Sequence, residues 1–138
     1  MGSLDTLIRI SKHDLDEKRR ALKELYDVLD GYERQKQAFE DGILREKKAL
    51  EGQDWNAHIT YAAFHRKTEK QIAEMSRSIA AAEKKIFALR DEMLEIFGEM
   101  KRYDIANDLR RSIEEEEKRL AETKSLDEIA METFRRAE

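Results

Sequence analysis

Apolar residues recur at alternating steps of three and four along the first fifty positions of the chain, and no proline interrupts them. This spacing places them on one narrow stripe of a helix, which suits burial by a partner helix better than burial in a globular core. The pattern therefore predicts a coiled-coil helix over about residues 3–51. We call this stripe the first seam; its members are Leu4, Ile8, Leu15, Leu22, Leu25, Leu29, Tyr32, Phe39, Ile43 and Leu50.

A second stripe with the same spacing follows a short segment of turn-forming residues. Residues 52–58 contain Gly52, Asp54 and Asn56, which favour a turn, and Asp54 or Asn56 can cap a following helix. We expect a second helix over about residues 59–136, folded back antiparallel on the first. The second seam consists of Ile72, Met75, Ile79, Ala82, Ile86, Leu89, Met93, Ile96, Met100 and Tyr103.

The place of the turn predicts which residues face each other. If the chain reverses next to Trp55, a residue numbered i in the first helix lies beside about residue 109 minus i, so Leu4 lies near Ile105. Beyond that level the apolar residues continue at Ala106 and Leu109, a three-three step that predicts an inserted half-turn in the coiled coil.

The last part of the second helix has no partner in this arrangement. Residues 106–138 overhang the paired region and carry four consecutive glutamates, Glu114–Glu117, followed by apolar Leu126, Ile129 and Phe134. A single amphipathic helix is marginal in water, so this segment needs a partner. The predicted fold class is all-α: a single coiled-coil rod over residues 1–138, built as a two-helix antiparallel hairpin with a longer, overhanging second helix.

Composition supports long helices and excludes several classes of protein. Charged residues make up 42% of the chain, and 27 basic and 31 acidic residues are mixed at short range, which gives no basic field for nucleic acid. The chain has no cysteine and no apolar run near the length of a membrane span. We expect a cytoplasmic soluble protein that meets membranes only through its partners.

Catalytic and metal-binding patterns are not found in the sequence. Glycine-rich phosphate loops, serine elbows and zinc-binding histidine pairs are missing, and no carboxylate stands three residues before His13, His58 or His65, as helical di-iron sites require. His58 and His65 share a helix face, but two imidazoles without a third ligand make a weak metal site. We therefore expect no enzymatic activity, no metal and no cofactor.

Two features allow both a binding and a structural interpretation. Trp55, the only tryptophan, is either an anchor for a partner or the residue that closes the end of the hairpin core. The basic cluster Lys18–Arg20 either grips an acidic surface or is a solvated helix face.

The two ends of the chain together resemble the FliJ family of flagellar export proteins, especially its alphaproteobacterial members. The opening Ser3-Leu4-Asp5-Thr6-Leu7-Ile8-Arg9-Ile10 with Leu15–Arg20 is similar to the start of the family, and Ser125–Ala130 with Phe134-Arg135-Arg136 is similar to its C-terminal signature. Between the ends the resemblance is architectural.

The resemblance implies a non-enzymatic stalk of the flagellar type III export apparatus, at its cytoplasmic face. The end with both termini would enter a hexameric export ATPase, and the rod would also contact the export gate membrane protein and export chaperones. The motif match implies ATPase contact by Asp5, Arg9, Asp16, Lys18, Arg19, Arg20, Asp127, Glu128, Phe134 and Arg135. Gate or chaperone contact would involve Tyr32, Phe39, Trp55 and Phe64.

Two alternatives come from other classes of protein. In a self-associating structural scaffold, both seams would be completed by another copy of the chain. In an export chaperone or adaptor, the aromatic residues near the turn would carry the binding energy.

Overall fold

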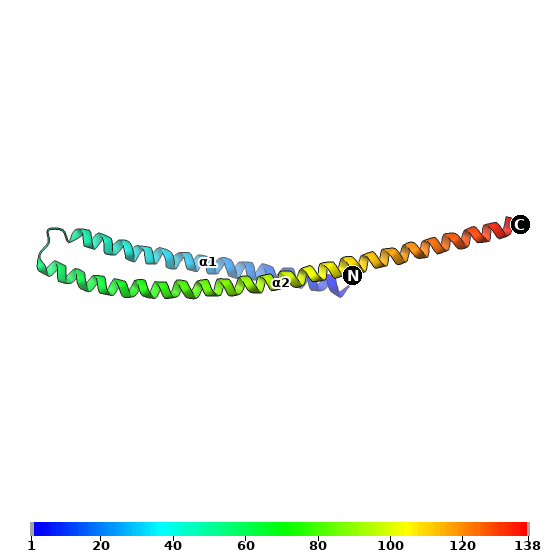
Figure 1. Ribbon diagram of the computed structural model, residues 1–138. Helices are drawn as coiled ribbons and strands as arrows, with labels where there is room; N and C mark the ends of the chain where they lie inside the picture. The colour runs from blue at the N-terminus through cyan, green and yellow to red at the C-terminus, as the bar shows by residue number, and fades with distance from the viewer. Residues whose placement is uncertain (1, 138) are drawn as a thin grey trace. The chain divides into compact units, whose positions relative to one another are not determined.

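The computed structural model describes residues 2–137 and consists of two helices, which confirms the all-α hairpin. Helix α1 spans Ser3–Ala49, and the longer helix α2 spans Trp55–Ala137 (Figure 1). The chain divides into two compact units, one made of Leu15–Leu94 and the other of Met1–Asp14 with Glu95–Glu138, of which residues 2–14 and 95–137 are described.

The turn between the helices is shorter than the sequence predicts. Leu50 and Glu51 tighten the end of α1 with backbone bonds to carbonyls three residues back, and Gly52 adopts a φ of 78°. This left-handed conformation, which glycine adopts without a Cβ clash, ends the helix. Helix α2 then begins at Trp55, not near residue 59, because the Ala57 backbone N–H donates to Asp54 Oδ1 at 3.0 Å. Asp54 is thus the capping residue.

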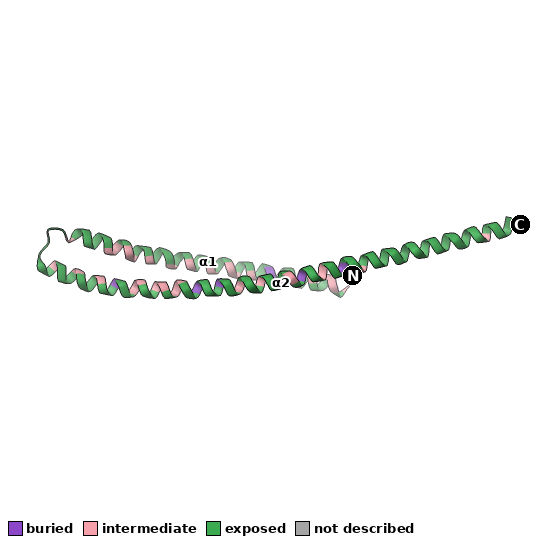
Figure 2. Ribbon diagram, in the orientation of Figure 1, coloured by how far each residue is buried: buried purple, intermediate pink, exposed green. Residues whose placement is uncertain are grey.

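Within the unit Leu15–Leu94, the two helices pair through the seams. Every first-seam residue of this unit is buried or half-buried, and so is every second-seam residue (Figure 2). Two contacts across the pair show the register. Lys18 Nζ lies 3.1 Å from Glu92 Oε2. The Phe64 ring lies next to Gly42, about 4.0 Å from the position that a Cβ atom on this glycine would occupy. These two pairs of numbers add to 110 and 106, which agrees with the predicted register of about 109.

Polar side chains take some positions of the buried stripes. Lys18 and Lys36 continue the three-four spacing of the first seam and are half-buried, while Thr68 occupies such a position in α2 and is only 3% exposed. Leu15, Ala82 and Ile86 are the apolar residues of this unit with the deepest burial. Because each helix has only one partner, most seam residues keep part of their surface in water.

In the other unit, residues 3–14 of α1 pair with the part of α2 around residues 95–110. The predicted half-turn at this level is wrong: the buried stripe of α2 continues from Met100 and Tyr103 to Asn107 and Arg110 without a change of spacing. Ala106 and Leu109, which the apolar pattern placed on the stripe, are exposed. The reason is that Asn107, 5% exposed, has a polar partner across the pair, so this buried position does not require an apolar residue.

Residues 111–137 of α2 are uncovered, so the overhang begins later than residue 106, where the sequence predicts it, because Asn107 pairs with Asp5 of α1 and Arg110 bonds to Asn107. All residues of this uncovered range are exposed apart from the half-buried Glu132 (Figure 2). The segment is nevertheless helical to Ala137, with ion pairs between neighbouring turns such as Arg119 with Glu116 and Arg136 with Glu132. Such exposed pairs contribute only a few tenths of a kcal/mol each, so they cannot replace a partner helix.

Candidate functional site

A polar clasp joins α1 to α2 in the unit that contains both described chain ends. We give this name to Asp5, Asn107 and Arg110. The Asn107 side-chain amide donates to Asp5 Oδ1 at 2.9 Å, and the Arg110 guanidinium donates to Asn107 Oδ1 at 2.9 Å. One carboxylate, one amide and one guanidinium thus satisfy one another at a level where the sequence offers no apolar pair.

The clasp is tightly enclosed on one side. Arg110 Nε is buried without a hydrogen bond, and Glu114 Oε1 lies 3.9 Å from it. The Arg110 guanidinium, the flexible end of that side chain, lies against Gly2 and would have to shift if a Cβ were added there. Sequence reasoning missed Asn107 and Arg110 because it followed apolar residues; the unchanged three-four spacing from Met100 was the signal that marks them.

The structure gives the predicted ATPase-binding residues of the N-terminal segment different environments. Asp5 is half-buried and belongs to the clasp, and Lys18 is half-buried and paired with Glu92. Arg9 and Arg20 are exposed. Asp16 and Arg19 are also exposed and pair with each other at 3.1 Å, one helical turn apart. Asp5 and Lys18 therefore form contacts between the two helices of the hairpin, whereas the other four side chains are open to a partner.

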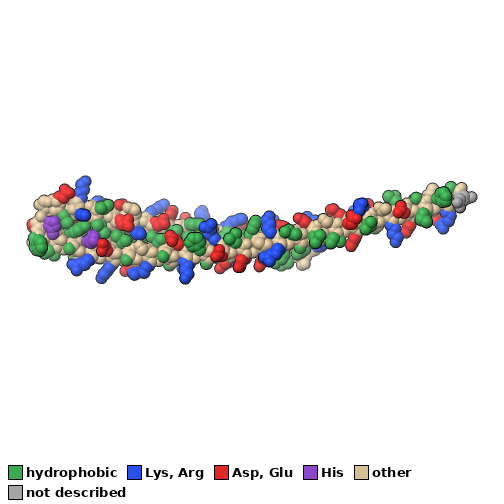
Figure 3. Space-filling model, in the orientation of Figure 1, with side chains coloured by type: hydrophobic (Ala, Val, Ile, Leu, Met, Phe, Trp, Pro, Cys, Tyr) green, Lys and Arg blue, Asp and Glu red, His purple; other side chains and the backbone are tan. Residues whose placement is uncertain are grey.

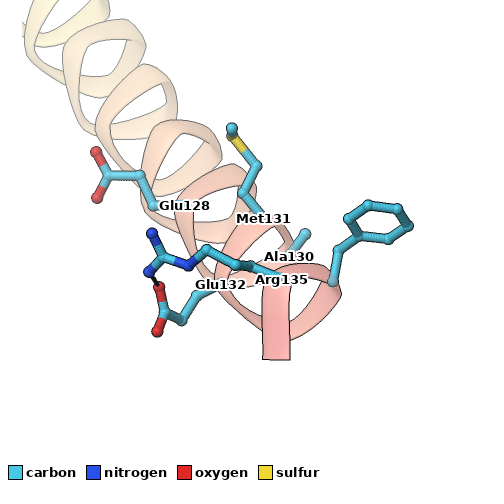
Figure 4. Close-up of a pocket in the computed structure, with 6 residues that line it drawn as sticks. Glu128, Ala130, Met131, Glu132 and Arg135 are labelled. Carbon is cyan, nitrogen blue, oxygen red and sulfur yellow. Dashed lines mark hydrogen bonds and ion pairs between the residues drawn. The ribbon is translucent and has the colours of Figure 1, made fainter. Parts of the chain in front are cut away.

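The predicted residues of the C-terminal segment all lie on the uncovered helix. Asp127, Glu128 and Arg135 are exposed, and the Phe134 side chain is 70% exposed. Figure 4 shows Glu128, Glu132 and Arg135 on one side of α2, with Arg135 bonded to Glu132, and Met131 directed elsewhere. The residues around this shallow hollow come from a single helix, so it can serve as a contact surface but does not enclose a small molecule.

The predicted gate- or chaperone-binding residues separate into two groups. Tyr32 and Phe39 are half-buried in the first seam, where they pack between the helices. Trp55 is 76% exposed, which decides against the interpretation that it closes the hairpin core. Phe64 is 37% exposed and lines a hollow near the turn together with Leu50 and Tyr61.

The surface near the turn carries further apolar and aromatic groups. Leu44 and Ile59 are 65% and 54% exposed, and His58 and Tyr61 line a second hollow together with Leu44. The Tyr61 and His65 rings lie 5.7 Å apart, and His65 Nε2 is 3.4 Å from Glu69 Oε1. His65 thus has partners on its own helix.

Basic and acidic side chains are interspersed over the visible surface (Figure 3). Among residues 2–137 no group of three or more histidine, aspartate or glutamate side chains is placed to hold a metal ion. Neither helix, over the same residues, has a stretch long and apolar enough to cross a membrane.

Comparison with known proteins gives one match. The family model described as flagellar FliJ protein matches residues 1–138, the whole chain. Neither the curated proteins nor the solved structures gave a significant match. A match of this extent, on a chain that folds as a helical hairpin, shows that the protein belongs to the FliJ family and is a component related to flagellar export.

Proposed function

We propose that this protein is the stalk of the flagellar export ATPase, with its terminal end inserted into the hexamer. The observation that carries the proposal is the uncovered segment 111–137, in which apolar side chains remain exposed on an intact helix. Membership of the FliJ family supports the identity of the partner. In this role the protein acts at the cytoplasmic face of the export apparatus and has no catalytic activity of its own.

A stalk can influence an ATPase ring only if it binds subunits in different states with different free energies. The exposed charges Arg9, Arg19 and Arg20 on α1, and Asp127 on α2, suit such unequal contacts, because exposed charged side chains can pair with one subunit and not with the next. Phe134 adds an aromatic anchor of the kind that dominates binding energy at interfaces.

The test uses purified export ATPase and measures its hydrolysis rate against added protein. We expect a variant truncated after Thr123 that also carries Arg19→Glu and Arg20→Glu to lose stimulation while keeping its helicity by circular dichroism. Lys47→Glu with Lys48→Glu is the matched control, because it reverses two adjacent charges at the other end of α1 and should leave stimulation unchanged. Full stimulation by the truncated, charge-reversed and still helical variant would contradict the proposal.

We further propose that the surface near the turn binds export chaperones or the export gate membrane protein. The exposed Trp55 supports this role because exposed aromatic residues are typical anchors, and Tyr61 and Phe64 line a hollow near the same turn. Trp55→Ala together with Phe64→Ala should weaken capture of a purified chaperone or gate domain and spare ATPase stimulation. If this double variant lost ATPase stimulation but still captured the chaperone or gate domain, the two ends of the rod would be assigned to the wrong partners.

A further inference from the structure

One face of α2 near the turn carries basic side chains without acidic ones. Nine positions from Ile59 to Phe87 follow one another at alternating steps of four and three. Each lies two positions before a buried or half-buried residue of the stripe that packs on α1, which places it about 200° away around the helix. All nine are exposed and face away from α1. We call them the outer strip; between its two ends it holds Ala63, Ala73 and Ala80 and the cations Arg66, Lys70, Arg77 and Lys84.

The four cations of the outer strip are open to an external partner. In the part of the chain that the structure describes, none of them forms an ion pair or a side-chain hydrogen bond, whereas Arg19, Arg34 and Arg119 each pair with a carboxylate one turn away. Figure 3 shows Lys and Arg side chains projecting from the part of α2 near the turn, along the lower edge of the view. Like charges on one helix face repel one another, and an anionic surface would relieve that repulsion.

Acidic residues flank the outer strip but do not enter it. Glu69 and Glu83 lie along one edge, and Glu74 lies along the other. Asp91, four residues after Phe87, is the first acidic residue in line with the strip. The alanines between the cations are short, so the long basic side chains reach furthest from the helix.

The charge balance differs between the two helices at this level of the hairpin. Over residues 59–87, α2 has six basic and three acidic residues, whereas α1 at the same levels, residues 22–50, has six basic and seven acidic ones. An anionic surface is therefore attracted to the outer strip and repelled by α1, so the charges determine which side of the hairpin faces it.

Bulky apolar side chains lie at both ends of the outer strip. Ile59 is 54% exposed and Phe87 is 64% exposed. Trp55, 76% exposed, lies four residues before Ile59 and within about 40° of it around the helix. Tryptophan is enriched where proteins meet the headgroup region of a bilayer, and a basic helix face with large apolar residues is typical of helices that lie in that region.

We propose that the outer strip binds the anionic surface of a phospholipid bilayer, with α2 lying along the membrane over about 42 Å. The four cations contact lipid phosphates, and Trp55, Ile59 and Phe87 enter the headgroup region. A nucleic acid backbone would leave these three apolar groups without a role. Tight protein interfaces bury large side chains in pockets, whereas the hollow along the strip is shallow and lined by residues of α2 alone.

This inference goes beyond the proposed stalk function and is tested separately from it. Under it the chain meets the membrane directly, and not only through the partners that its sequence implies. The test uses the chain and lipids alone, so a failure to bind lipid leaves the ATPase proposal untouched. A failure of ATPase stimulation likewise leaves the lipid site untouched.

Co-sedimentation of the full chain with vesicles tests the proposal. We expect binding to vesicles of phosphatidylglycerol and phosphatidylcholine in equal parts, and none to pure phosphatidylcholine. One basic side chain near such a surface changes partitioning by a factor of about five, so Arg77→Gln with Lys84→Gln should weaken binding about 25-fold. Added salt should weaken binding of the natural chain, because it screens these charges.

The matched control is Lys23→Gln with Arg34→Gln. It removes two exposed cations at nearly the same levels of the hairpin, but from the outward side of α1, and it changes the net charge equally. Because the control charges lie more than a Debye length from the bilayer, this variant should change binding less than about threefold. Circular dichroism of both variants checks that their helices are intact.

The fluorescence of Trp55, the only tryptophan, measures the contact at one end of the strip. Its emission should shift to shorter wavelength on the anionic vesicles, and lipids brominated close to the headgroup should quench it. Emission that stays unchanged while the chain binds would contradict the placement of this end.

The proposal would be overturned by a chain that does not bind the anionic vesicles at low salt. Equal losses in the strip variant and the control would also overturn it, because net charge and not one face would then decide binding. If the chain ignores vesicles but the strip variant loses capture of a purified gate domain, the outer strip is a site for an acidic protein and the membrane proposal is wrong.

Discussion

Removal of the Asn107 side chain should loosen the pairing of residues 3–14 with α2. In Asn107→Ala, Asp5 loses the amide that now donates to it at 2.9 Å, and Arg110 loses its acceptor. A hydrogen bond to a charged group contributes about 1.5–3 kcal/mol, and Asp5 is only half-buried, so water can replace part of that. Alanine also favours the helix by about 0.6 kcal/mol relative to asparagine. The net cost should be about 1–2 kcal/mol.

Amide hydrogen exchange measures this loss locally. A cost of about 1–2 kcal/mol corresponds to exchange that is roughly 5–30-fold faster in residues 3–14, since 1.4 kcal/mol is a factor of ten. Exchange in the unit Leu15–Leu94 should change much less, because its seams are untouched. Asp108→Ala is the matched control, since this neighbouring side chain is exposed.

The double variant Asp5→Ala/Asn107→Ala decides whether the clasp acts as one unit. If the two side chains stabilise the pairing through their mutual bond, the second substitution adds little to the first, and the coupling energy should be about 1 kcal/mol. Effects that add within about 0.3 kcal/mol would refute the reasoning, because they would mean that each residue acts alone.

Three further outcomes follow from the turn, the glycines and the uncovered segment. Asp54→Ala should lower the free energy of unfolding in urea by about 1 kcal/mol through loss of the cap, while Asn56→Ala should have a much smaller effect. Gly31→Ala should raise thermal stability by about 0.5–1 kcal/mol, since Gly31 is exposed in a helix with open space around it, whereas Gly52→Ala should lower it because of the positive φ. Deletion of residues 111–137 should change the urea-unfolding free energy of the remaining hairpin by less than about 0.5 kcal/mol, and a larger loss would show that this exposed segment contributes to the pairing.

The candidate binding residues show what spacing and motif resemblance can and cannot supply. The exposed Arg19, Asp127 and Phe134 could be proposed from the sequence alone, because they belong to terminal segments that resemble those of the FliJ family. Contact between Asp5 and Asn107 could not, since it joins residues 102 positions apart through polar atoms. A pattern of apolar residues carries no information about which polar side chains satisfy each other across a pair.

The sequence by itself determined that the chain forms two helices, where it turns and which stripes pair, because the three-four spacing and the turn residues act locally. It also determined that α2 is the longer helix and that its last part is uncovered. Only the tertiary structure decided that the buried stripe continues through Asn107 and Arg110 while Leu109 turns outward. The physical reason is that a polar side chain can be buried only where a residue on the other helix satisfies its hydrogen bonds. Asp5 accepts a hydrogen bond from the buried Asn107 amide, and an apolar residue in place of Asp5 would leave that amide unsatisfied.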